Sequence, residues 1–451
     1  IAIAIAVAAY GSRVLERHAP ALGAGERGLA VLTLGLGVLL DPEAQHFATG
    51  GFTELPFTLG LVIALGMLLD ETAPRRPFAF GLLLGATGAF RATMLWLAPV
   101  LAIAAAAIAG RRRTRIVTLT LAGYALVLAP WWFYKWTSFG SPGWDLSRFV
   151  IWEGVEGRSW FSLFHLPEAP AVPHGLDAAR LIAAKIAHRL PALAATLGAG
   201  PRALWIGALA IWAAVGRPPR ALAVTAAAIL AALAIALVTA AASIPWIRFL
   251  FPARIPLEAA GVLALWGLLA RAPATLFGPR AARVIAALVA VLALGWGVSQ
   301  TARGTAEARV AAAERGVPGD ATMRALGARV AAEVPAGEAV MSNLGPTLAW
   351  TSGHPVVHLA LTPGDVGACR RRVEFRHVVL VFRDADQAWP GWRDAIARPA
   401  ESTARPEWNV IRERHWQEPD GFHVVWLELG PPEARVARAP AATRPAISAG
   451  A

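Results

Sequence analysis

Arginine residues divide the loops of this 451-residue chain into two kinds, and that division constrains the fold most. Long apolar runs alternate with short loops, and every second loop is rich in arginine. The arginines of the basic loops are Arg13, Arg17, Arg27, Arg75, Arg76, Arg111, Arg112, Arg113, Arg115, Arg217, Arg220, Arg271, Arg280 and Arg283. Short loops that carry Lys and Arg are retained on the cytoplasmic side of a membrane. The pattern therefore predicts membrane spans, a cytoplasmic face and an outer face together.

The composition agrees with a polytopic membrane protein. Hydrophobic residues make up 56% of the chain and charged residues only 16%, whereas soluble domains are about a quarter charged. The net charge of +12 would indicate nucleic-acid binding in a soluble chain. Here much of the excess lies in the basic loops, and no basic stripe with interleaved aromatic residues is present. We therefore expect membrane lipid as a partner and no nucleic acid.

Ten apolar segments predict about ten α-helical membrane spans. They cover residues 1–15, 29–40, 56–69, 78–90, 94–109, 116–136, 203–215, 221–242, 257–270 and 284–299. Several are shorter than the roughly 20 residues that a straight span requires, so we expect them to extend into the flanking loops. The chain begins inside an apolar run with no basic region before it, which indicates an N-terminally truncated fragment rather than a signal peptide.

Residues 78–109 are too long for one ordinary span, yet arginines flank both ends. If both ends are cytoplasmic, the segment must turn back, and Arg91 is the only charge within it. We predict a helical hairpin whose tip, residues 90–93, points outward. The same rule places three further segments outside: residues 41–54, 137–189 and 243–256. Within the second of these, residues 178–189 predict an amphipathic helix along the surface.

After residue 300 the long apolar runs give way to short, alternating strand-like and helix-like runs. This alternation predicts a small α/β domain, extracytoplasmic by the same parity. Residues 408–413 and 423–429 predict a closing β-hairpin. The predicted organisation is a transmembrane domain over 1–300 that includes the outer loop 137–189, an extracytoplasmic α/β domain over 301–430, and a disordered tail over 431–451. Its single cysteine, Cys369, can form no internal disulfide.

The predicted outer loop 41–54 concentrates three carboxylates and a histidine between two spans: Asp41, Glu43, Glu54 and His46. Carboxylates and an imidazole suit a divalent cation or general-base catalysis. Glu54 also stands at the start of the next helix, where the helix dipole favours a carboxylate, so a plain capping loop is the alternative. We predict Glu54, His46 and Asp41 as catalytic candidates, with Glu54 and His46 as candidate ligands of Mg, Mn or Zn.

Arg248 and Arg254 lie among aromatic residues and prolines where an apolar span meets the predicted outer interface. Arginine binds a phosphate bidentately, and snorkelling to lipid headgroups is the alternative. Arg91 is the third basic candidate, because an ionisable group within membrane segments indicates function by default. Weaker candidates in the long outer loop are Glu153, Glu156, Arg158 and His165.

Three local patterns, in this order, resemble the GT-C superfamily of membrane glycosyltransferases. Residues 39–54 resemble an outer loop in which an acidic residue, here Glu54, starts a helix. Residues 85–99, with Phe90-Arg91-Ala92-Thr93 at their centre, resemble the family's Gly-rich hairpin, and Arg248-Phe249-Leu250-Phe251-Pro252 resembles its Arg-Tyr-Leu-Leu-Pro element. Residues 334–355 resemble the family's soluble domain. The most similar members are bacterial dolichyl-phosphate-mannose–protein mannosyltransferase-like and aminoarabinose-transferase-like enzymes.

The resemblance implies transfer of a sugar from a polyprenyl-phosphate donor to a glycan, lipid or protein acceptor at the outer face of a bacterial inner membrane. Arg248, Arg254 and Arg91 would bind the donor phosphate. Glu54, with His46 and Asp41, would contact the acceptor or a divalent cation. The family's principal catalytic carboxylate is expected upstream of residue 1.

Two non-enzymatic alternatives remain. A secondary transporter would require inverted repeats and polar broken helices at the membrane midplane, and the sequence shows neither. A non-catalytic assembly protein, or a carrier of envelope glycolipid, would fit the same topology. Transfer from a labelled polyprenyl-phosphate sugar distinguishes the enzyme from both.

Overall fold

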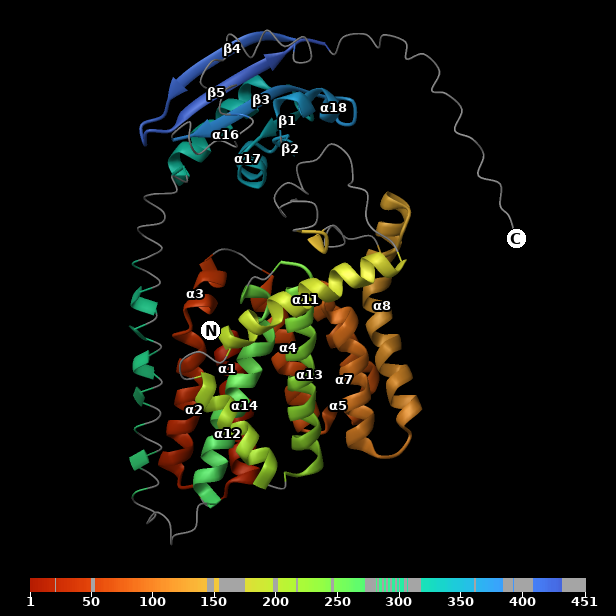
Figure 1. Ribbon diagram of the computed structural model, residues 1–451, viewed down its shortest axis with the longest axis vertical. Helices are drawn as coiled ribbons and strands as arrows, with labels where there is room; N and C mark the ends of the chain where they lie inside the picture. Colours follow the sequence, from red (N-terminus) through yellow and green to blue (C-terminus); the bar gives the residue numbers. More distant parts are fainter. Residues whose placement is uncertain are drawn as a thin grey trace, which may run out of the picture. The chain divides into compact units, whose positions relative to one another are not determined.

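A computed structural model describes residues 1–20, 22–49, 53–143, 150–153, 175–197, 202–215, 218–244, 247–271, 318–360, 362–383 and 409–431, with Trp392 and scattered positions between 281 and 306. The chain forms two compact units, Ile1–Glu153 with Val172–Ala308 and Gly154–Ala171 with Arg309–Ala451. The described part of the first unit is helical, and the second contains a five-stranded sheet (Figure 1).

The helices of the first unit follow the apolar runs of the sequence closely. They are α1 (Ala2–His18), α2 (Ala24–Leu39), α3 (Pro42–Thr49), α4 (Glu54–Leu69), α5 (Thr72–Arg75), α6 (Pro77–Gly88), α7 (Met94–Ala109), α8 (Arg113–Phe139), α11 (Gly175–Leu197), α12 (Arg202–Val215), α13 (Arg220–Ala242), the short 3-10 helix η2 (Ile247–Phe249) and α14 (Phe251–Arg271). Helix α7 has the predicted bounds, and α13 begins one residue early. The segment predicted over 284–299 lies largely outside the described residues.

Glycine allows α6 and α8 to pack against each other closely. A Cβ atom at Gly81 of α6 would lie 2.0 Å from the carbonyl oxygen of Thr120, and one at Gly123 of α8 would lie 2.5 Å from that of Phe78. Both positions therefore exclude any side chain. Contacts of this kind between small residues are characteristic of helix pairs inside membranes.

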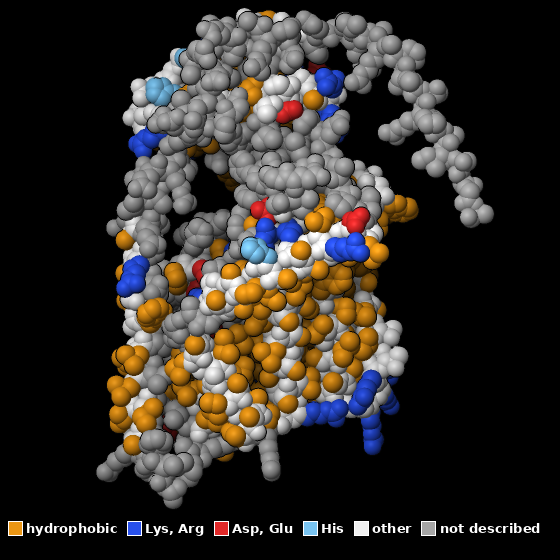
Figure 2. Space-filling model, viewed as in Figure 1, with side chains coloured by type: hydrophobic (Ala, Val, Ile, Leu, Met, Phe, Trp, Pro, Cys, Tyr) orange, Lys and Arg blue, Asp and Glu red, His pale blue; other side chains and the backbone are white. Residues whose placement is uncertain are grey.

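Two helices of the described residues, α8 and α13, are long and apolar enough to cross a membrane. Helices α11 and α12, bent by 93° at their junction, would count as a third span if taken together. Helices α4, α6 and α7 are apolar but shorter, so the total of ten spans stays a prediction. Figure 2 shows hydrophobic side chains over the flank of the bundle and Lys and Arg side chains at its lower end.

The turns between helices correspond in part to the sequence predictions. Arg91 lies in the break between α6 and α7, as predicted. Helix α11 covers the predicted amphipathic helix and runs across the bundle at a steep angle to α13, which it contacts (Figure 1). The start of α14 was predicted wrongly, because the helix begins at Phe251 rather than at residue 257. Pro252 occupies its first turn, where the missing N–H is not required.

The second unit is a mixed sheet in the order β2-β1-β3-β5-β4. Its strands are β1 (Ala339–Ser342), β2 (Val356–His358), β3 (Phe375–Phe382), β4 (Val410–Gln417) and β5 (His423–Leu429), and its helices are α16 (Asp320–Glu333), α17 (Gly345–Ser352) and α18 (Val366–Arg370). Strand β1 pairs in parallel with β2 and β3, whereas β5 pairs antiparallel with β3 and β4. The small α/β architecture and the closing hairpin are thus confirmed. The tail predicted over 431–451 lies outside the described residues after Pro431.

Alternate residues of the central strand β3 pack into two different apolar clusters, one on each face of the sheet. Val378 and Leu380 of β3 contribute to one apolar cluster, and Val379 and Val381 to the other. This alternation is the two-residue period of a β-strand. It explains why residues 378–382 are apolar throughout rather than at every second position.

Candidate functional site

Glu54, Arg91 and Arg248 come from three distant segments and meet in the first unit. Glu54 begins α4, Arg91 lies between α6 and α7, and Arg248 lies in η2. Glu54 Oε1 is 3.2 Å from Arg91 Nη1 and 3.9 Å from Arg248 Nε. We call these three residues the Glu54 cluster. The sequence singled out each of them, and the structure brings them together.

The three members of the Glu54 cluster differ in their exposure. The Glu54 side chain is 4% exposed and that of Arg91 is 10% exposed, whereas that of Arg248 is 34% exposed. Arg248 is therefore the member that an incoming ligand would reach first. Glu54 and Arg91 form the buried base behind it.

An aromatic ring holds both guanidinium groups of the cluster in place. The centre of the Phe249 ring lies 5.0 Å from the Arg91 guanidinium carbon and 5.2 Å from that of Arg248. The Phe57 ring lies 5.9 Å from the Arg91 guanidinium. Such cation–π contacts stabilise partly buried arginines and limit their rotation. The positive groups are therefore pre-arranged around one carboxylate.

The Glu54 cluster carries one more positive charge than negative. Burial lowers the pKa of Arg91 and of Arg248, and the nearby Glu54 carboxylate opposes that shift in both. Arginine is not deprotonated in proteins, so both groups stay charged near neutral pH. Arg91 Nη1 is buried, and among the described residues its 3.2 Å contact with Glu54 Oε1 is an ion pair without hydrogen-bond geometry. The arrangement is chemically suited to an anion with several oxygen acceptors.

Arg254 lies in a separate ion-pair cluster. It is almost fully buried, and its Nη2 is 2.6 Å from Asp41 Oδ2 and 3.5 Å from Glu43 Oε2. Its Nε is 3.8 Å from Glu258 Oε1, which also pairs with Arg202 at 3.1 Å. Three carboxyl groups surround these two guanidinium groups, so a phosphate at Arg254 would have to displace them. The geometry therefore favours a structural role for Arg254 over the predicted phosphate contact.

Asp41 has a structural position as well. Its Oδ1 accepts a hydrogen bond from the backbone N–H of Ala44 at 2.9 Å, which caps the start of α3, and its Oδ2 faces Arg254. Both carboxylate oxygens are thus engaged, so the predicted catalytic role of Asp41 is not favoured. The sequence interpretation did not single out Glu258. Its position four residues after Arg254 on one helix was the available signal.

The residues around Glu54 do not fit the predicted divalent cation. Two guanidinium groups within 4 Å of its carboxylate would repel a metal ion. The described residues contain no group of three His, Cys, Asp or Glu side chains that could hold a metal. The side chain of His46 lies outside the described residues, so its predicted roles are not placed.

Glu153, a weaker candidate, pairs with α11. Arg189 of α11 contacts Glu153 Oε2 at 2.6 Å and donates to the Ser243 carbonyl at 2.7 Å. Lys185 donates to the Ile151 carbonyl at 2.7 Å, and burial, followed by the nearby Arg189 charge, lowers its pKa to about 8. These contacts fix α11 to the chain shortly before Arg248. The other weak candidates, Glu156, Arg158 and His165, lie outside the described residues.

Comparisons with protein-family models, with curated proteins and with solved structures each found no match. The function is therefore inferred from the geometry of this chain and from its local sequence patterns.

Proposed function

We propose that this chain is a polytopic membrane glycosyltransferase of the GT-C type. It would move a sugar from a polyprenyl-phosphate donor to a glycan, lipid or protein acceptor at the outer face of a bacterial inner membrane. The observation that carries the proposal is the convergence of Arg91 and Arg248 on the buried Glu54. Two fixed guanidinium groups, one of them accessible, match the charge and oxygen geometry of a phosphate.

The membrane location has support from three features. Arginine alternates between loops, apolar side chains cover the flank of the bundle (Figure 2), and glycines let α6 and α8 approach closely. Arg91 precedes the 16-residue α7 and the basic residues from Arg111 onward follow it. A helix of that length separates its ends by about 24 Å. The Glu54 cluster and this basic loop therefore belong to opposite ends of the bundle.

The proposed reaction breaks the bond between the sugar's anomeric carbon and a donor phosphate oxygen, and forms a bond from that carbon to the acceptor. Negative charge develops on the departing phosphate. Arg248 and Arg91 would stabilise that charge because they are already oriented and partly shielded from water. Glu54 would hold the two guanidinium groups together before the donor binds. The proposal assigns no described residue as the base that removes the acceptor proton.

The test is sugar transfer from a radiolabelled polyprenyl-phosphate donor by membranes that contain the protein. Arg248→Ala is expected to abolish transfer, because its guanidinium is the accessible phosphate contact, and to leave the folded protein intact. Arg115→Ala, at an exposed arginine in the first turn of α8, is the matched control and is expected to keep full activity. Wild-type turnover by Arg248→Ala would refute the site, and donor binding without transfer by the wild type would favour the carrier alternative.

A further inference from the structure

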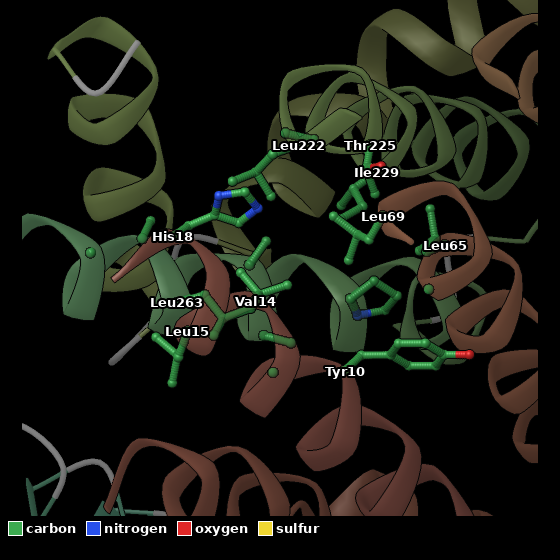
Figure 3. Close-up of a pocket in the computed structure, with 18 of the residues that line it drawn as sticks. Tyr10, Val14, Leu15, His18, Leu65, Leu69, Leu222, Thr225, Ile229 and Leu263 are labelled. Atoms are coloured by element: carbon green, nitrogen blue, oxygen red, sulfur yellow. The ribbon is translucent and has the colours of Figure 1, made fainter. Parts of the chain in front are cut away.

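A cavity with an apolar lining lies inside the bundle and is separate from the Glu54 cluster. Five helices enclose it: α1, α4, α12, α13 and α14. Figure 3 shows aliphatic side chains from α1, α4, α13 and α14 around this space, including Val14, Leu69, Ile229 and Leu263. Glu54, Arg91 and Arg248 are not among its lining residues. The proposed sugar-transfer site therefore does not account for the cavity.

The cavity has the length of one leaflet of a bilayer. Its lining positions on α14 extend from Pro256 to Gly267, which at 1.5 Å per residue corresponds to about 16 Å. The hydrocarbon core of a membrane is about 30 Å thick, so one leaflet contributes about 15 Å. An aliphatic chain that enters from one side of the membrane would fill such a space along its length.

The chemistry of the lining favours hydrocarbon over water. The hydroxyl of Thr225, a polar lining group, already donates to the Ala221 carbonyl at 2.8 Å. Ordered water requires several polar partners, and cavities lined by aliphatic groups stay dry. An empty cavity would forfeit the van der Waals contacts of its lining. A flexible aliphatic chain needs no polar partners and would restore these van der Waals contacts.

One end of the cavity reaches a basic end of the bundle. Its lining includes His18, the last residue of α1, and the exposed Pro219, which precedes α13. Exposed arginines adjoin both: Arg17 next to His18 and Arg220 next to Pro219. Arg17 shares Asp70 with Arg13, so two guanidinium groups face one carboxylate there. The charge at this end is therefore complementary to an anionic headgroup.

We propose that this cavity binds one acyl chain of an anionic phospholipid from the leaflet at the arginine-rich end, with the headgroup phosphate beside Arg17 and Arg220. The proposal rests on the membrane location proposed above but not on sugar transfer. The site is thus a lipid-binding site distinct from the donor site, and it faces the opposite leaflet.

Two adjacent alanines on α13 provide a matched test. Ala226 lines the cavity, whereas Ala227 is exposed on the outside of the same helix. The protein would be reconstituted in dioleoylphosphatidylglycerol vesicles, extracted in mild detergent and weighed by native mass spectrometry. The wild type and Ala227→Phe are expected to retain one phosphatidylglycerol. Ala226→Phe is expected to reduce its occupancy at least tenfold, because the added ring takes the place of the chain.

A second variant and a second lipid complete the design. Ala260→Leu, which fills the cavity from α14, is expected to lose the lipid as well, and its thermal transition in detergent shows that it folds. Dioleoylphosphatidylcholine is expected to be retained at least tenfold less than phosphatidylglycerol by the wild type. Equal phosphatidylglycerol retention by the wild type and both cavity variants would overturn the proposal, as would equal retention of phosphatidylcholine. Polyprenyl-phosphate binding at Arg248, measured on the same proteins, separates this outcome from failure of the donor site.

Discussion

Substitution of Glu54 by glutamine perturbs the Glu54 cluster most sharply, because it removes one charge and preserves the side-chain shape. Arg91 and Arg248 would then lie close together without the carboxylate that both of them face. We expect the free energy of unfolding to fall and the affinity for a phosphate to rise. These opposite effects distinguish an anion site from an ion pair that only stabilises the fold.

The magnitude of the stability loss follows from burial. Removing one partner of a buried ion pair costs about 3–5 kcal/mol, because the other charge stays buried and uncompensated. Arg91 and Glu54 are both nearly buried, so their pair falls in this range. Arg248 is a third exposed, and solvent-screened pairs contribute only about 0–1 kcal/mol. We therefore expect Glu54→Gln to lower the free energy of unfolding by about 3 kcal/mol.

The gain in phosphate affinity follows from Coulomb repulsion. A carboxylate about 6 Å from a bound phosphate, at an effective dielectric constant of about 20, repels it by about 3 kcal/mol. Glutamine removes that repulsion, and each 1.4 kcal/mol corresponds to about a tenfold change in Kd. We expect polyprenyl phosphate to bind Glu54→Gln at least tenfold more tightly than it binds the wild type.

The assay is denaturant unfolding of purified protein in detergent, followed by tryptophan fluorescence, with and without polyprenyl phosphate. Glu16→Gln is the control, because Glu16 is an exposed carboxylate that accepts a hydrogen bond from Ser12, and its substitution is expected to change stability by less than about 0.5 kcal/mol. The reasoning is refuted if Glu54→Gln is as stable as the wild type without ligand. It is refuted equally if the ligand stabilises Glu54→Gln less than it stabilises the wild type.

Three further predictions concern the structure around the site. Arg254→Ala is expected to destabilise the protein by about 3–5 kcal/mol in the same unfolding assay, because it removes the buried guanidinium that faces Asp41 and Glu43; an unchanged transition would contradict its structural role. Gly81→Ala is expected to cost about 1–3 kcal/mol through overpacking against Thr120, whereas Gly207→Ala, with open space around it, is not expected to destabilise; equal effects would argue against close α6–α8 packing. The pKa of Lys185 is about 8 in the folded protein rather than 10.5, so the folded protein holds this proton less tightly than the unfolded chain does. The free energy of unfolding should therefore rise as the pH increases between these values. Lys185→Met should remove that rise.

The helical part of the fold could be predicted from local patterns. The apolar run over residues 94–109 predicted the bounds of α7, because it lies between Arg91 and Arg111. The start of α14 could not be predicted in this way, because the apolar run begins only at residue 257, after Pro252 and Pro256. The structure places Pro252 in the first turn of α14 and continues the helix through Pro256. A proline in a sequence does not reveal whether the helix begins before it.

The members of the site could be predicted individually, but their partners could not. Arg254 and Asp41 are 213 residues apart, and no local pattern indicates that they would pair. Both arginines of the 248–254 segment were predicted to bind phosphate. Only the packing of η2 and α14 directs Arg248 toward Glu54 and buries Arg254 among carboxylates.

The most direct test of the central claim is an experimental structure of the protein in a membrane mimic with polyprenyl phosphate bound. The account predicts that the phosphate oxygens lie within hydrogen-bonding distance of the guanidinium groups of Arg248 and Arg91, at the start of α4. A phosphate bound elsewhere, with Arg91 and Arg248 still facing Glu54, would contradict it.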